Sequence, residues 1–137
     1  MVHEVSGVKL PDTKLATEAT ELVRQASPLP LFNHCVRTYV FADSLGKKMN
    51  KQYDSELLYL ACVMHDLGLV EKYIKDARFE IDGADAAQDF LTHRGYSPER
   101  VSVVWEAIAL HASMEIPLRR QSEVTLVHMG PSWTPAS

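Results

Sequence analysis

Residues 57–68 read LLYLACVMHDLG, an apolar run that leads directly into His65 and Asp66 and is followed by Gly68. Eight uncharged residues before His65 predict a helix that is buried on most of its sides, not an amphipathic surface helix. A carboxylate at the inner end of such a helix costs free energy unless a hydrogen-bond partner or a metal ion compensates it. The pair therefore predicts a metal site, with a metal-free buried hydrogen-bonded pair as the alternative.

Helical signals continue on both sides of this segment. Caps, prolines and apolar periodicity predict further helices over residues 12–26, 31–49, 83–94, 97–111 and 122–129. The expected caps are Asp12 or Thr13 for the first helix, Asp54 or Ser55 for the helix that leads to His65, and Ser97 for the helix over residues 97–111. Residues 69–82 are expected to form a helical turn and a loop. Residues 1–11 are expected to be an extended lead-in, and no stretch shows the sustained two-residue alternation of a sheet. The predicted fold class is all-α, a single-domain bundle of about five to six helices over residues 1–137.

Composition and charge exclude several classes of function. The chain has 137 residues, 46% hydrophobic and 23% charged, which is typical of one globular domain. A formal net charge of −4 without a basic stripe argues against nucleic acid as a partner. No apolar run approaches the roughly 20 residues of a membrane span, and the first residues lack the apolar core of a signal peptide. Cys35 and Cys62 are expected to be free buried thiols. We expect a cytoplasmic protein that acts on a small molecule, and self-association into a homo-oligomer stays open.

The residue types around His65 suit a divalent metal ion. Neutral imidazole and carboxylate together bind Zn, Fe, Mn and related ions. Neighbouring side chains diverge by about 100° on a helix, so His65 and Asp66 can share one ion only if another helix also holds it. The apolar pattern of residues 31–49 predicts a buried central helix, on which His34 is expected to be buried and can supply that third ligand. His111 ends an apolar helix, where it could instead interact with the exposed carbonyl groups, and its role stays open.

Four motifs in order resemble the HD-domain proteins, and more narrowly the cyanamide hydratase-like branch found in fungi. They are Asn33-His34, residues 60–68, residues 78–84 and residues 105–111. The resemblance covers about residues 28–130, and residues 131–137 diverge from it. It implies a helical HD fold that holds one divalent metal ion, most often zinc or iron.

The resemblance also implies roles for individual residues. Carried over motif by motif, it makes His34, His65 and Asp66 the metal ligands. It makes Glu80 and His111 candidates for lining the substrate pocket or moving protons. The implied reaction is the addition of metal-activated water to a small nitrile such as cyanamide, which gives urea.

One part of the family pattern is missing from this sequence. HD proteins normally supply a fourth ligand, an Asp on a later helix, whereas no Asp follows Asp89 here. Asp82 and Asp85 are candidates to replace it, although their position in the sequence gives no geometric support. A truncated, non-catalytic HD domain is therefore one alternative function.

A phosphohydrolase acting on a nucleotide or phosphomonoester is the other alternative. Such a site needs cations to hold the phosphate group, and four lie near the motifs: Arg37, Lys72, Lys75 and Arg78.

Overall fold

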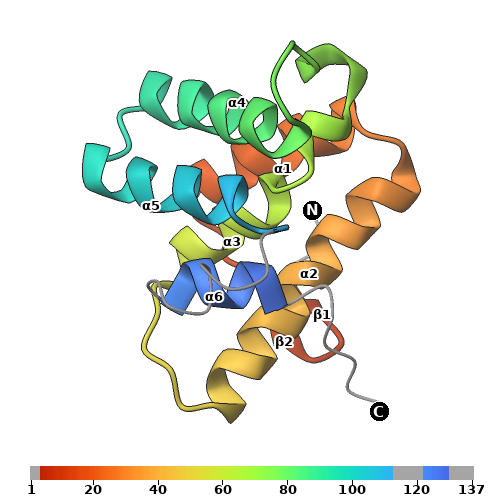
Figure 1. Ribbon diagram of the computed structural model, residues 1–137. Coiled ribbons are helices and arrows are strands. Elements are labelled where there is room, and N and C mark those ends of the chain that lie inside the picture. Colours follow the sequence, from red (N-terminus) through yellow and green to blue (C-terminus); the bar gives the residue numbers. More distant parts are fainter. Residues whose placement is uncertain (1–3, 113–121, 130–137) are drawn as a thin grey trace.

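Helix α3 (Ser55–Met64) is buried on most of its sides, as its apolar sequence predicts, and it lies at the centre of the fold in place of the helix over residues 31–49, which was predicted to be central. The side chain of Asp54 caps it by accepting a 3.0 Å hydrogen bond from the backbone N–H of Leu57. All eight residues from Leu57 to Met64 are buried, because four helices pack around α3 (Figure 1). They are α1 (Lys14–Ala26), α2 (Leu29–Lys48), α5 (Pro98–Ala109) and α6 (Ser122–Met129). The end of α3 that carries His65 is therefore fixed from several sides.

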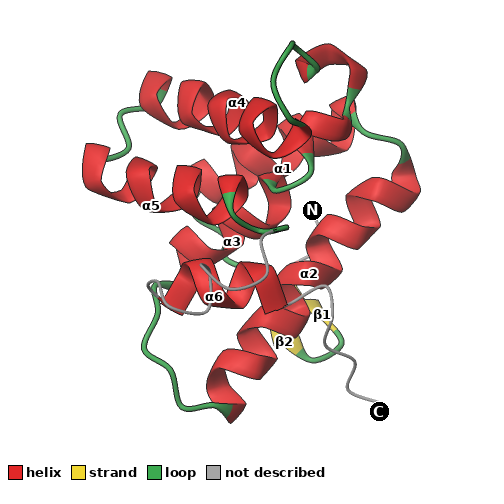
Figure 2. Ribbon diagram, viewed as in Figure 1, coloured by secondary structure: helices red, strands yellow, loops and turns green. Residues whose placement is uncertain are grey.

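The computed structural model describes residues 4–112 and 122–129. Within these ranges the fold is helical apart from one short hairpin, which confirms the predicted all-α class (Figure 2). Besides α3, the elements are β1 (Glu4–Val5), β2 (Val8–Lys9), α1 (Lys14–Ala26), α2 (Leu29–Lys48), the 3₁₀ turns η1 (Leu67–Leu69) and η2 (Glu71–Tyr73), α4 (Phe79–His93), α5 (Pro98–Ala109) and α6 (Ser122–Met129). None of the described helices is both long and apolar enough to cross a membrane. The expectation of a divergent tail falls on residues 131–137, outside the described ranges.

Helix starts follow the predicted caps where a capping side chain is present. Thr13 accepts a hydrogen bond from the N–H of Ala16 and begins α1, and Ser97 does the same for Arg100 at the start of α5. Helix α2 begins at Leu29, two residues before the predicted start, with Pro30 in its first turn. A proline is tolerated there because the first N–H groups of a helix have no partner within the helix.

Helix α4 begins at Phe79, four residues before the predicted start, so Glu80 and Asp82 are helical. The prediction used Gly83 as a boundary, but this glycine lies inside the helix and serves close packing. A Cβ at Gly83 would lie 2.9 Å from the backbone N of Gly68, and a Cβ at Gly68 would overlap the carbonyl group of Phe79. The two glycines let the first turn of α4 rest directly on η1, just after Asp66.

The first residues form a hairpin, not only the extended lead-in that the sequence predicted. Strands β1 and β2 pair antiparallel, with Glu4 opposite Lys9 and Val5 opposite Val8. Ser6 and Gly7 make the turn with φ angles of 50° and 79°, the left-handed region that two-residue hairpin turns use. Two-residue strands are too short to show an alternating pattern, which is why the sequence did not reveal them.

Candidate metal centre

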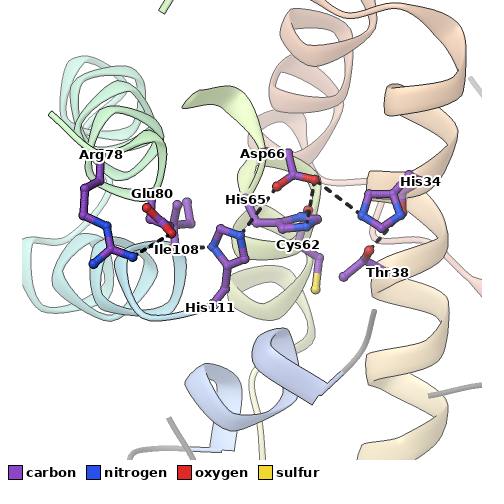
Figure 3. Close-up of polar contacts among 9 residues, drawn as sticks. All are labelled: His34, Thr38, Cys62, His65, Asp66, Arg78, Glu80, Ile108 and His111. Carbon is purple, nitrogen blue, oxygen red and sulfur yellow. Dashed lines mark hydrogen bonds and ion pairs between the residues drawn. The ribbon is translucent and has the colours of Figure 1, made fainter. Parts of the chain in front are cut away.

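His65 and Asp66 converge because the helix ends between them. Helix α3 stops at Met64, His65 caps it, and Asp66 has left the helix at φ −106° and ψ 17°. The divergence of about 100° between helical neighbours therefore does not apply. Nε2 of His65 lies 3.2 Å from Oδ2 of Asp66, and Nε2 of His34, from α2, lies 3.4 Å from the same oxygen (Figure 3).

The three predicted ligands form one compact donor set. His34, His65 and Asp66 each offer one ligand atom, and these atoms all lie within 4.8 Å of one another. Two imidazoles and one carboxylate are a donor set that Zn, Fe and Mn accept. The structure thus brings together the three residues that the sequence analysis selected, from two separate segments of the chain.

The tautomer of His65 is fixed by the backbone. Its Nδ1 lies 2.7 Å from the carbonyl oxygen of Cys62, and because a carbonyl only accepts, Nδ1 must carry the hydrogen. In neutral His65 the Nε2 atom then presents a lone pair to the carboxylate of Asp66. A lone pair and a carboxylate oxygen repel each other at this distance unless a cation, either a proton or a metal ion, lies near both. The ring is therefore oriented as a metal ligand.

His34 is the open side of the donor set. Its side chain is 41% exposed, whereas that of His65 is 2% exposed. The prediction that His34 is buried was wrong, because the first turns of α2 extend beyond the buried end of α3 (Figure 1). Partial burial and the nearby His65 lower the pKa of His34, so its neutral, metal-binding form is favoured at pH 7. The donor set is therefore exposed to solvent on the side of His34.

His111 approaches the other oxygen of Asp66. It follows the end of α5, and its Nε2 lies 3.6 Å from Oδ1 of Asp66. Its Nδ1 donates to the carbonyl oxygen of Ile108 at 2.6 Å, so the same kind of backbone bond orients both this ring and that of His65. The rings of His65 and His111 meet edge to face, with centroids 5.0 Å apart.

The pKa values of Asp66 and His111 are shifted in opposite directions, that of Asp66 downward and that of His111 upward. Burial raises the pKa of Asp66, but the imidazoles of His111 and His65, which can hydrogen-bond to the carboxylate through Nε2 when they are protonated, outweigh burial and leave that pKa well below its ordinary value. Burial likewise lowers the pKa of His111, but the hydrogen bonds to Asp66 and to the Ile108 carbonyl leave it raised. In the metal-free chain the two groups therefore form an ion pair.

Glu80 lies beside His111, in the first turn of α4 (Figure 3). It is a buried carboxylate: Oε1 accepts a 3.2 Å hydrogen bond from Arg78, and Oε2 is buried and has no hydrogen-bond partner among the residues that the structure describes. Its negative charge contributes to the raised pKa of His111. A buried acceptor without a partner usually indicates a functional group or a missing ligand.

Asp82 and Asp85 do not replace the missing fourth carboxylate. Asp82 accepts a 2.9 Å hydrogen bond from the backbone N–H of Lys75, and Asp85 accepts one of 2.9 Å from the indole N–H of Trp105. Neither belongs to the metal-holding group found in the described part of the chain. His111, not a second carboxylate, lies next to Oδ1 of Asp66, the oxygen that His34 and His65 do not approach.

Sequence reasoning missed the groups that orient the ligands. The Cys62 carbonyl acts through the backbone, so no residue type reveals it. The contact between Gly68 and Gly83 did have a signal, because a glycine two residues after Asp66 stands where a side chain would block another segment.

Comparison with known proteins agrees with this geometry. A family model described as HD domain matches residues 31–128, more than half of the chain, and this range includes all five candidate site residues. A search of curated proteins gave no match.

Proposed function

We propose that this chain, which belongs to the HD-domain family, is a metal-dependent enzyme that adds water to a small nitrile such as cyanamide. The family implies a metal-dependent, hydrolase-like protein, and a His-His-Asp cluster is present. The choice of a nitrile rests on the sequence resemblance together with the charge distribution around the cluster.

One observation supports the proposal most strongly: three imidazole Nε2 atoms face a single carboxylate. Those of His34 and His65 lie 3.4 and 3.2 Å from Oδ2 of Asp66, and that of His111 lies 3.6 Å from Oδ1. The Nε2 atoms of His34 and His65 beside the same carboxylate oxygen fit a divalent cation held by His34, His65 and Asp66, with His111 on the other oxygen as a proton carrier. When bound there, such an ion would supply Lewis acidity that lowers the pKa of water toward neutrality.

Nitrile hydration also needs a proton at the substrate nitrogen, and His111 is placed to give it. The charges of Asp66 and Glu80 favour a proton on this ring, and the bond to Ile108 leaves Nε2 as the atom that faces the centre. Water oxygen bonds to the nitrile carbon, one C–N π bond breaks, and the nitrogen takes the proton from Nε2. The proton that water releases returns to His111, and a tautomeric shift of the adduct gives the amide, which for cyanamide is urea.

The charges around the centre favour a neutral substrate over a phosphate ester. Arg78 is paired with Glu80, and the ammonium group of Lys72 lies 5.5 Å from the centre of the Tyr73 ring. The buried carboxylates of Asp66 and Glu80 repel a phosphate dianion, and Oε2 of Glu80 can instead accept an N–H group of substrate or product. Cyanamide and urea both carry N–H groups.

The test is a pair of assays on the chain supplied with Zn²⁺ or Fe²⁺. We expect urea from cyanamide and no phosphate release from a panel of nucleotides and phosphomonoesters, with both activities absent in Asp66→Asn. Phosphate release without urea would replace the proposal by the phosphohydrolase alternative. A folded, metal-loaded chain without either activity would favour the non-catalytic alternative.

A further inference from the structure

A cavity lies away from the metal centre, between the β1–β2 hairpin, α1 and α2. Its volume is about 570 Å³, within the range of small-molecule sites, and none of the five candidate site residues lines it. Its walls are mainly apolar and include Val5, Leu10, Phe32 and Val36. Nothing in the proposed hydration reaction uses this space.

The deep wall of the cavity presents polar atoms that are already satisfied. Thr20 donates from Oγ1 to the carbonyl of Ala16 at 2.7 Å, and its hydroxyl lies 2.5 Å from the hydroxyl of Tyr59. With the Thr20 hydrogen committed to Ala16, the hydroxyl of Tyr59 donates to Thr20. The deep wall therefore has no free donor hydrogen to offer a ligand, and it suits an apolar group.

The charged residues that line the cavity leave one positive charge without a partner. Glu21 and Arg24, one turn apart on α1, pair with each other. Arg37, on α2, is exposed and has no hydrogen bond or ion pair anywhere in the described part of the chain. One acidic and two basic side chains line the cavity, so their net charge is +1, and Arg37 carries the charge that is not paired within the described residues.

We propose that this cavity binds a small molecule with an apolar body and a single carboxylate group, such as a medium-chain fatty acid. The apolar body fills the space between Phe32 and Val36, and the carboxylate pairs with the guanidinium of Arg37. A guanidinium matches a carboxylate with two parallel hydrogen bonds. A dianion is disfavoured because Glu21 also lines the cavity.

This site is separate from the metal centre, although both use α2. His34 faces Asp66, whereas Asn33, Val36 and Arg37 line the cavity. Binding at the cavity therefore requires no metal ion. This independence matters for the test, because a carboxylate can also bind a metal ion directly.

The test is calorimetric titration of the full chain with decanoate, and with decanol as the neutral analogue of equal length. We expect one saturable site for decanoate and binding about tenfold weaker for decanol. Arg37→Gln should weaken decanoate binding about tenfold, whereas Lys48→Gln, an equal charge change at the exposed far end of α2, should leave it unchanged. Thr17→Trp, which adds bulk at an exposed lining position, should abolish it.

His65→Ala separates this site from the metal centre. Decanoate binding that persists in this variant is the expected result, and binding that disappears would mean that the carboxylate occupies the metal centre instead. Absence of saturable binding to the wild-type chain would overturn the proposal, as would equal binding of decanol and decanoate. Circular dichroism checks that Thr17→Trp is folded, and Arg37→Gln gives an independent test at an exposed position.

Discussion

Nε2 of His65 lies 3.2 Å from Oδ2 of Asp66, although adjacent residues of a helix point about 100° apart. The end of α3 at Met64 makes this approach geometrically possible, and the hydrogen bond from Nδ1 to the Cys62 carbonyl fixes the atom that His65 presents. Together with His65, His34 and His111 place three imidazole side chains around the carboxylate of Asp66. The predictions below test this arrangement.

Asp66→Asn should abolish metal binding and activity while the chain stays folded. The substitution keeps the size of the side chain but removes the charge that two imidazoles share, and we expect metal affinity to fall by at least about 100-fold. Equilibrium dialysis against Zn²⁺ measures this. Asp89→Asn, the same change at an exposed position of α4, should bind metal as the wild type does, and equal losses in both variants would contradict the assignment.

Gly68→Ala should destabilise the chain and displace Glu80 from the centre. The new Cβ would overlap the carbonyl group of Phe79, so the first turn of α4 must move, at a cost of about 2–3 kcal/mol in the free energy of unfolding. Urea denaturation measures the loss of stability. Gly95→Ala is the control: its φ of 75° makes alanine cost about 1 kcal/mol, far from the centre. We expect activity to survive in Gly95→Ala and to be lost in Gly68→Ala.

Glu80→Gln should lower the turnover rate by about 100-fold without destabilising the fold. The change removes the negative charge beside His111 and leaves the size of the buried side chain unchanged. Steady-state rates of urea formation and thermal melts provide the two readouts. Glu99→Gln, at the exposed start of α5, makes the same chemical change and should alter neither the rate of urea formation nor the melting temperature. A fully active Glu80→Gln would remove Glu80 from the mechanism.

The ion pair of Asp66 and His111 predicts how stability depends on pH in the metal-free chain. The raised pKa of His111 means that its contribution is complete below about pH 6.5 and is lost as pH rises through the folded-state pKa. The lowered pKa of Asp66 means that its contribution is present above about pH 4 and is lost as pH falls through its own folded-state pKa.

The stability difference between wild type and His111→Gln should therefore be largest between about pH 4 and 6.5, and smaller at pH 8. Urea denaturation in a chelating buffer at several pH values gives this difference. A difference that stays constant across the range would show that the ring contributes packing alone, without an ion pair.

The sequence predicted the fold class and the adjacent pair of His65 and Asp66 because both depend on local signals. Asp54, Thr13 and Ser97 are capping residues whose side chains act on their own helix, and they appear where expected. His65 and Asp66 can likewise be recognised locally, because they directly follow the apolar run of residues 57–64. His34 was selected as its partner only through the helical pattern and the family resemblance.

Features that depend on tertiary packing could not be predicted in this way. The start of α4 was misplaced because Gly83 was taken for a helix boundary, whereas it is required by the contact with Gly68. The exposure of His34 depends on how far α2 extends beyond α3, which periodicity does not encode. The cavity beside Arg37 lies between the β1–β2 hairpin, α1 and α2, which only the tertiary fold brings together.

Elemental analysis of the purified chain shows whether the cluster of His34, His65 and Asp66 holds a metal ion. We expect close to one equivalent of zinc or iron per chain, lost in His65→Ala and retained in His93→Ala, which removes an exposed histidine of α4. A folded wild-type chain that binds no metal, even after incubation with Zn²⁺ or Fe²⁺, would rule out the metal centre and leave His65 and Asp66 as a buried hydrogen-bonded pair.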